Sequence, residues 1–303
     1  MCVKEVMLIS VCMCTYRRSH VVETLKSLDQ QVLPDGVELE VVVVDNDESA
    51  FARNLVLNQA KKMAIPVVYA QETAKNIAKA RNKTIAKASG EWLAFIDDDE
   101  VADSQWIKHL LVTAETFEAD VVFGRVISLY PANTPQWVIK SGAFERPMRP
   151  EGTKVSSGGT NSTLVNKRFL DHHALIFDDS YGLTGGEDAD LFHRMHELGA
   201  KLVTSSNATV SEEVAQDRLN SSYILRKSFR VGETYTRYRL IDQSFSRKLR
   251  YMAENFSKGM VFFVWMLVLL PLGKNAYFKP LLGLADKAGK LKALFSKRVV
   301  ELY

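Results

Sequence analysis

The sequence is poor in cysteine and has no export signal. Its three cysteines, Cys2, Cys12 and Cys14, all lie near the start, and an odd number without a second cluster excludes a disulfide framework and a four-ligand zinc site. We expect reduced core thiols in a cytosolic protein. The first residues lack a basic stretch followed by a signal-length apolar run and a cleavage site, so the sequence does not predict export.

An excess of charge of one sign is also missing. The formal net charge is +3 and the isoelectric point is near 8.6, values too mild to indicate a nucleic-acid partner. Hydrophobic residues make up 47% and charged residues 25% of the chain, which excludes a disordered protein. A chain of 303 residues is long enough for one large α/β domain or two smaller domains.

Apolar runs rich in valine and isoleucine alternate with segments of helical spacing. The runs predict buried strands at 6–14, 39–44, 67–69, 92–96 and 120–127. Helices are predicted at 21–28, at 50–63 and from Asn76 to about residue 90. Strands joined to helices by short connections predict βαβ units, right-handed crossovers and a parallel, twisted sheet.

Polar side chains stand where these strands end. Thr15 follows the first strand, Asp45 the second, and the triplet Asp97-Asp98-Asp99 follows the strand at 92–96. We expect them on one rim, because ligands bind beyond the carboxyl ends of the strands in open sheets. Neither G-x-G-x-x-G nor G-x-x-x-x-G-K-[ST] is present, so a nucleotide there would need a metal for its phosphates. Three carboxylates suit Mg²⁺ or Mn²⁺; the alternative is a solvated turn before the next helix.

Prolines and glycines interrupt the pattern from 131 to 159, which predicts a binding loop or, alternatively, a mobile surface excursion. A strand at 163–165 follows. Two glycines then precede Glu187-Asp188, and the apolar spacing after that pair predicts that it lies on the first turn of a helix. The pair is either an ordinary acidic first turn or a fixed general base beside a substrate.

Four segments together resemble the nucleotide-sugar glycosyltransferases of family 2. They are VCMCTYRR, VVVVDN, AKARNKTIAKASGEWLAFIDDDE and GGEDADLFHRMHELGAKL, and the resemblance covers about residues 6–240. The CTYRR segment and the run from Arg218 to Gly232 are most similar to the bacterial exopolysaccharide branch, which includes succinoglycan-type glucosyltransferases. The resemblance implies a GT-A fold, in which a Rossmann-like nucleotide half joins an acceptor half on a mixed, mostly parallel sheet.

The resemblance also implies roles for single residues. Thr15 and Asp45 would contact the base, with uracil preferred, and Arg81 would reach the base or the diphosphate. Asp188 matches the family's catalytic base, which implies one in-line displacement that inverts the anomeric centre. Glu187 would bind a hydroxyl of the acceptor or donor.

A metal site is implied at the D-x-D motif. Asp99 would be the direct Mn²⁺ or Mg²⁺ ligand with Asp97 as a second, while Asp97 or Asp98 would lie nearer the ribose. Many GT-A enzymes add a histidine ligand from a later strand, but here that region has Glu212 and Glu213. Either Glu212 replaces it, or Asp99 and the diphosphate hold the ion; we favour the second. The Q-x-x-R-W motif of processive synthases is missing, which favours single additions.

The C-terminal part, 241–303, is predicted to be helical, basic and amphipathic, beyond a glycosyltransferase domain at 1–240. The apolar run at 261–272 is too short for a transmembrane helix. Basic residues follow it: Lys274, Lys279, Lys287, Lys290, Lys292, Lys297 and Arg298. An apolar helical face accompanies them: Leu281, Leu284, Ala288, Leu291 and Phe295. The combination predicts an interfacial helix on anionic lipid or, alternatively, a helical hairpin packed on the enzyme or on a dimer partner.

The sequence therefore predicts an inverting, metal-dependent hexosyltransferase. It would use a nucleotide-diphosphate sugar such as a UDP-hexose and a lipid-linked saccharide acceptor, on the cytoplasmic face of the membrane, in bacterial surface polysaccharide synthesis. A nucleotidyltransferase is the alternative enzyme, because it too places acidic metal ligands at strand ends. A carbohydrate-binding protein of the same fold without turnover is the alternative outside the enzymes.

Overall fold

The computed structural model describes residues 6–240 and 243–295, so Cys2, Lys297 and Arg298 lie outside the described residues. The chain forms two compact units. The first contains residues up to 127 together with 147–212, and the second contains 128–146 and the residues from 213 onward. We expected the boundary after residue 240. The units instead separate within two long strands, which assigns the helix before residue 240 to the C-terminal unit.

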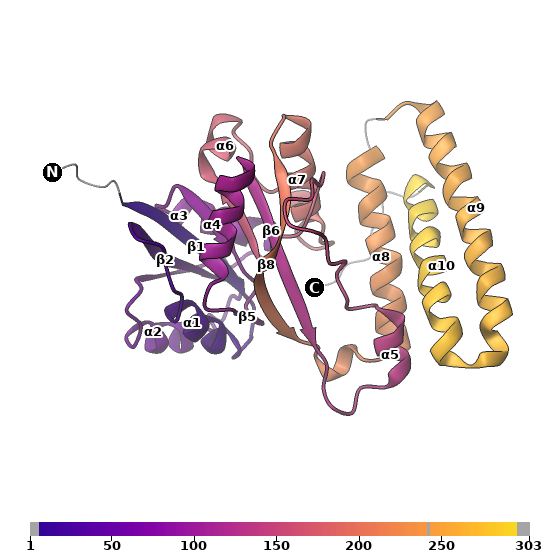
Figure 1. Cartoon of the computed structure of the whole chain (residues 1–303), viewed down its shortest axis with the longest axis horizontal. Helices are drawn as coiled ribbons and strands as arrows, with labels where there is room; N and C mark the ends of the chain where they lie inside the picture. The colour runs from indigo at the N-terminus through magenta and orange to yellow at the C-terminus, as the bar shows by residue number, and fades with distance from the viewer. Residues whose placement is uncertain (1–5, 241–242, 296–303) are drawn as a thin grey trace. The chain divides into compact units, whose positions relative to one another are not determined.

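A mixed sheet of eight strands runs through the first unit (Figure 1). Its strands are β1 (Met7–Thr15), β2 (Val37–Asp45), β3 (Val67–Gln71), β4 (Trp92–Phe95), β5 (Glu100–Ala102), β6 (Val121–Leu129), β7 (Thr163–Asn166) and β8 (Leu202–Glu213). Their spatial order is β3-β2-β1-β4-β7-β6-β8-β5. The first four pair in parallel, and β7 runs antiparallel to both β4 and β6. The predicted α/β class with a mostly parallel sheet is confirmed.

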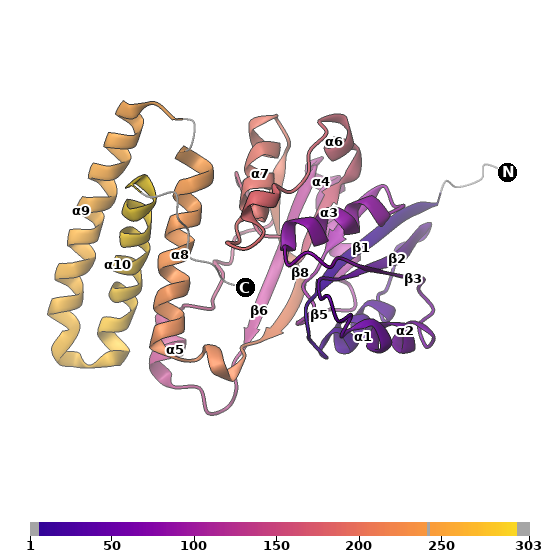
Figure 2. The same cartoon turned by 180° about the vertical axis from the view of Figure 1, so that it is seen from behind.

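Helices cover both faces of this sheet. They are α1 (Val21–Asp29), α2 (Arg53–Ala60), α3 (Ile77–Lys87), α4 (Trp106–Phe117), α6 (Lys167–His172), the 3-10 turn η1 (Asp179–Tyr181) and α7 (Glu187–Glu197). Side chains alternate along each strand, so β1 buries Val11 under α1, α2 and α4 and buries Cys12 under α3, α6 and α7. Figure 1 shows α4 in front of the sheet, and Figure 2 shows α3 in front.

Some short elements were missed in the sequence, and α5 (Gln136–Ser141) and β5 are two of them. The predicted loop at 131–159 contains the helix α5, and β5 follows the acidic triplet directly. β5 pairs antiparallel with β8, which opposes Glu100 to Glu212. Three residues are too few to show a strand period, so only the tertiary pairing defines β5.

Helices dominate the second unit. They are α5, the 3-10 turn η2 (Gln216–Arg218), α8 (Ser221–Leu240), α9 (Phe245–Leu269), the 3-10 turn η3 (Leu270–Leu272) and α10 (Lys274–Phe295). α10 packs against both α8 and α9. Its contact with α8 is close, because a Cβ on Gly289 would lie 1.9 Å from the carbonyl oxygen of Phe229. The face predicted to lie on lipid is therefore partly used in packing: Leu281, Leu284 and Leu291 are half-buried, whereas Ala288 and Phe295 stay exposed.

The apolar surface of this unit lies on α9 instead. The run at 261–272, which we judged too short to span a membrane, is the end of a longer helical segment, Phe245–Leu272. By length and composition alone this segment is long and apolar enough to cross a membrane, and 11% of its most apolar window is buried. Its exposed large side chains include Phe256, Met260, Val261, Phe263, Val264, Trp265, Leu267, Val268, Leu270 and Leu272.

Candidate active site

Thr15 and Asp45 stand side by side at the ends of β1 and β2. The parallel register pairs them directly, and both side chains are buried. The backbone N–H of Asn46 donates to the carbonyl oxygen of Thr15 at 2.8 Å, which continues the ladder one residue beyond the strands. The structure therefore brings together the first two residues of the predicted rim.

The Asp45 carboxylate has one oxygen held by the protein and one without a partner. Its Oδ2 accepts the N–H of Ala52 at 2.9 Å and the hydroxyl of Tyr69 at 3.1 Å. Its Oδ1 is buried and has no hydrogen-bond partner, and burial raises the pKa of the carboxyl. A buried acceptor without a donor costs free energy. The site can therefore accept a hydrogen bond from a ligand donor such as a ring N–H.

Asp98 is the buried centre of the triplet. Thr15 donates its hydroxyl to Oδ2 at 2.7 Å, and Arg18 Nη1 donates to Oδ1 at 3.0 Å. From α1, the Thr24 hydroxyl donates to the Asp98 carbonyl oxygen at 3.1 Å. Burial raises the pKa of Asp98 to about 6, against the opposing effect of Arg18. These contacts from β1, α1 and the loop between them fix the position of the triplet.

Asp97 and Asp99 are the accessible members of the triplet, with side chains that are 43% and 21% exposed. Asp99 also pairs with Arg18. Among residues 6–240 and 243–295 there is no group of three or more His, Cys, Asp or Glu side chains placed to hold a metal ion. Two carboxylates together with substrate phosphates are a ligand set that Mg²⁺ accepts. The residues present thus fit a cation shared with a nucleotide.

Arg81 of α3 joins the triplet to the later acidic pair. It donates to Glu187 and lies 3.6 Å from an Asp97 oxygen through Nη2. Its side chain is largely buried. Its guanidinium carbon, Cζ, lies over the ring of Phe177, 5.8 Å from the ring centroid. Arg81, which the sequence predicted to contact the base or the diphosphate of the donor, thus has two protein carboxylates as partners in this structure. Arg81 links the strand end to the first turn of α7.

Glu187 and Asp188 open α7, as the sequence predicted. Gly185 and Gly186 precede them with φ of +71° and +99°, a left-handed backbone that favours glycine. Glu187 is buried, which raises its pKa to about 7 although Arg81 opposes the rise. Its second oxygen, Oε2, is buried without a hydrogen-bond partner. Glu187 therefore holds Arg81 with one oxygen and offers the other to a ligand donor.

Asp188 lies against the end of the predicted binding loop. Its Oδ1 accepts the backbone N–H of Ala189 at 2.7 Å. A Cβ on Gly159 would lie 3.2 Å from its Oδ2, so a larger residue would crowd the carboxylate. The next residue, Thr160, has a buried hydroxyl without a hydrogen-bond partner. The 131–159 segment therefore contributes its last residue to the surroundings of Asp188.

Sequence reasoning assigned no role to Arg18, Tyr69, Gly159 or Thr160. Arg18 stood in the CTYRR segment, but its carboxylate partners are 80 and 81 positions away. Tyr69 was predicted only to lie in a strand. The hydrogen bond that its hydroxyl donates to Asp45 depends on the pairing of β2 with β3. Of these four residues only Gly159 carried a local signal, because a glycine in a loop often marks a close approach of the backbone to another group.

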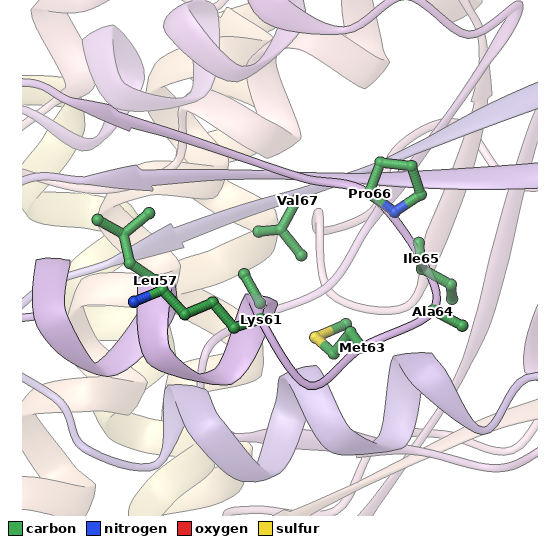
Figure 3. A pocket seen from close by; sticks show the side chains of 8 residues that line it. Leu57, Lys61, Met63, Ala64, Ile65, Pro66 and Val67 are labelled. Carbon is green, nitrogen blue, oxygen red and sulfur yellow. The ribbon is translucent and has the colours of Figure 1, made fainter.

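A separate pocket of about 450 Å³ lies between the end of α2 and the start of β3 (Figure 3). Its lining is Leu57, Ala60, Lys61, Met63, Ala64, Ile65, Pro66 and Val67. Val67 begins β3, whereas the rim lies at the opposite end of the parallel strands, where Gln71 pairs with Asp45. The pocket is therefore distinct from the rim, and with one charged side chain it has few groups to orient a ligand.

Comparison with known proteins places this arrangement in a family. The model described as glycosyl transferase family 2 matches residues 10–173. The chain is 35% identical over 235 residues to the succinoglycan biosynthesis protein ExoM of Rhizobium meliloti, which covers 77% of this chain and 75% of that protein. It is 27% identical over 244 residues to the glucosyl-dolichyl phosphate glucuronosyltransferase of Haloferax volcanii, covering 75% of each.

A solved structure shows the same fold. Residues 1–349 of TarS from Staphylococcus aureus, in complex with UDP, align with a TM-score of 0.54 at 18% identity. The alignment covers 96% of this chain and 93% of that one.

Proposed function

The chain belongs to glycosyltransferase family 2, and on that premise we propose that it is an inverting, metal-dependent hexosyltransferase. It moves a sugar from a nucleotide-diphosphate donor, a UDP-hexose, to a lipid-linked saccharide acceptor in the synthesis of a bacterial surface polysaccharide. The GT-A fold expected from the motifs agrees with the likeness to TarS. Family membership also favours glycosyl transfer over the alternative of nucleotidyl transfer.

One observation carries the proposal: Arg81 bridges the strand-end carboxylate Asp97 and Glu187, the neighbour of Asp188. The donor half and the acceptor half of the site are thereby held in one ionic network, in which Arg81 and Glu187 are largely buried and Asp97 is accessible. A transfer reaction needs a leaving group and a base held at fixed separation. A protein that only binds carbohydrate has no need of a carboxylate held in this way beside a diphosphate site.

The donor would bind along the rim. Asp45 Oδ1, buried without a partner, accepts the ring N–H of uracil, and Thr15 lies next to it in the register. Asp97 or Asp98 lies nearer the ribose. Asp99, with Asp97, would hold Mn²⁺ or Mg²⁺, which supplies positive charge that stabilises the diphosphate as a leaving group.

The acceptor hydroxyl attacks the anomeric carbon from the face opposite the nucleotide. Its oxygen forms the new bond to C1, the bond between C1 and the diphosphate oxygen breaks, and the nucleoside diphosphate leaves with the electron pair. Asp188 takes the hydroxyl proton, which becomes acidic as the new bond forms. Glu187 Oε2 accepts a hydrogen bond from a sugar hydroxyl and orients it.

Three features support the acceptor class and the location. ExoM is named for succinoglycan biosynthesis, and the Haloferax volcanii relative is named as acting on a glucosyl-dolichyl phosphate, a lipid-linked sugar. The exposed apolar side chains of α9 lie in a helix whose first half carries Arg247, Lys248 and Arg250. An apolar surface with adjacent basic residues binds anionic lipid headgroups and acyl chains. We infer that α9 attaches the enzyme to the cytoplasmic membrane face.

A donor screen with product analysis tests the proposal. The purified full chain is incubated with a set of nucleotide sugars, a membrane-lipid extract containing lipid-linked saccharides, and Mn²⁺ or Mg²⁺. We expect release of nucleoside diphosphate together with a lengthened lipid-linked saccharide of inverted anomeric configuration. Release of pyrophosphate would instead identify a nucleotidyltransferase, and tight sugar binding without any product would identify a binding protein.

A further inference from the structure

Arg18 lies at the carboxylates where a cation is expected. It belongs to the turn between β1 and α1, and its Nη1 atom contacts both Asp98 Oδ1, at 3.0 Å, and Asp99 Oδ2. Asp98 is buried and also held by Thr15, whereas Asp99 is partly exposed. One guanidinium nitrogen thus joins an anchored carboxylate to an accessible one.

This arrangement sets two positive charges in competition. A divalent cation that uses Asp99 approaches the carboxylate that Arg18 already contacts, and like charges at short distance repel. Asp98 gives Arg18 a second anchor that a cation bound at Asp99 does not remove. The Arg18 side chain is 39% exposed, so it reaches the solvent side of the rim. A planar guanidinium also matches phosphate oxygens with two parallel hydrogen bonds.

We propose that Arg18 is a positioning residue that occupies the cation's place on Asp99 in the ligand-free enzyme and turns to the donor's diphosphate when the cation binds. The proposal rests on the metal-dependent transfer proposed above. Arg18 then opposes metal binding while the site is empty and favours binding of the nucleotide diphosphate. The enzyme avoids holding a free cation without a donor, and the cation and donor bind together.

Binding measurements on Arg18→Gln test this, without any need for turnover. Binding of Mn²⁺ alone is followed by the loss of the electron paramagnetic resonance signal of the free ion. Binding of UDP in EDTA is followed by calorimetry. Removal of one partly exposed ion pair is worth up to about fivefold, so we expect R18Q to bind Mn²⁺ about fivefold more tightly and metal-free UDP about fivefold more weakly. General damage to the site would weaken both.

Arg17→Gln is the matched control. Arg17 stands in the same turn, carries the same charge and pairs with Asp47 at 3.0 Å rather than with the triplet. We expect R17Q to leave Mn²⁺ binding unchanged. If R18Q proves unstable on melting, Arg18→Lys replaces it, because lysine keeps the charge but lacks the planar fork; we expect it to weaken metal-free UDP binding and leave the protein folded.

The results distinguish the failure of the proposed role of Arg18 from the failure of the metal-dependent function. Unchanged or weaker Mn²⁺ binding by R18Q, in a wild-type protein that binds Mn²⁺ with UDP, overturns the role of Arg18 and leaves the metal-dependent function standing. Wild-type protein that takes up no Mn²⁺ even with UDP overturns both. An equal increase in Mn²⁺ affinity in R17Q and R18Q would show that the effect comes only from the change in net charge, which also overturns the proposal.

Discussion

Arg81 donates a hydrogen bond to Glu187, a residue 106 positions later in the chain. The pair ties α3, which follows β3, to the first turn of α7. Both side chains are largely buried, so removal of either one would leave the other as a buried charge without its partner, which destabilises the fold. Asp188, the proposed base, is therefore held to the strand-end half of the site by an ionic contact through its neighbour Glu187.

Arg81→Met should destabilise the protein by about 3 kcal/mol, because it leaves Glu187 buried without its cation. Denaturant unfolding measures this. The double variant R81M/E187Q should lose less than the sum of the two single variants, since the neutral amide tolerates burial better. Lys83→Met is the control from the same helix: its pair with Glu72 is more exposed and should cost less than about 1 kcal/mol. Additive losses in the double variant would contradict the coupling.

Stability should depend on pH through Glu187. Its pKa is raised by burial from 4.5 to about 7, so the folded state keeps a proton that the unfolded state releases. The stabilising contribution is full below pH 4.5 and is lost as the pH rises through about 7. The melting temperature of the wild type relative to Glu187→Gln should therefore fall across that window. A constant difference between the two proteins would show that Glu187 does not titrate there.

Asp99→Asn should raise the Mn²⁺ concentration for half-maximal transfer by at least about tenfold, because one carboxylate ligand is lost to a neutral amide. EDTA should abolish wild-type transfer. Asp103→Asn serves as control, since this exposed carboxylate just beyond β5 lies outside the triplet. An unchanged Mn²⁺ requirement in D99N would remove Asp99 from the metal site.

The exposed surface of α9 should bind vesicles that contain anionic phospholipid, and salt should weaken the binding. The double variant Trp265→Glu/Val268→Glu should reduce vesicle co-sedimentation by more than about tenfold. Each apolar side chain that moves from water into the lipid contributes about 1.5–3 kcal/mol to the free energy of binding. Val32→Glu, exposed in the other unit, should have no effect. Equal binding by all three proteins would contradict this, and a dimer lost in the double variant would assign the surface to a second copy.

The sequence predicts most of the sheet and the rim, because both follow from local patterns. Runs such as VVVVD show a buried strand and the polar residue that ends it, and the parallel register then places Asp45 beside Thr15. The partners of Arg18 and Arg81 have no local signature, since each depends on how distant elements pack. The C-terminal helices show the same limit: spacing predicts an apolar face on α10, but packing against α8 and α9 partly covers that face, and many exposed large apolar side chains lie on α9.

The most direct test of the account is turnover by Asp188→Asn, measured beside its donor affinity. Asp190→Asn, on the same helix and paired with Arg194 at 2.8 Å, is the control. We expect D188N to bind UDP as the wild type does and to lose sugar transfer by about 10³-fold, the share of rate that a positioned base supplies. Transfer by D188N at the rate of D190N would contradict the assignment of Asp188 as the base.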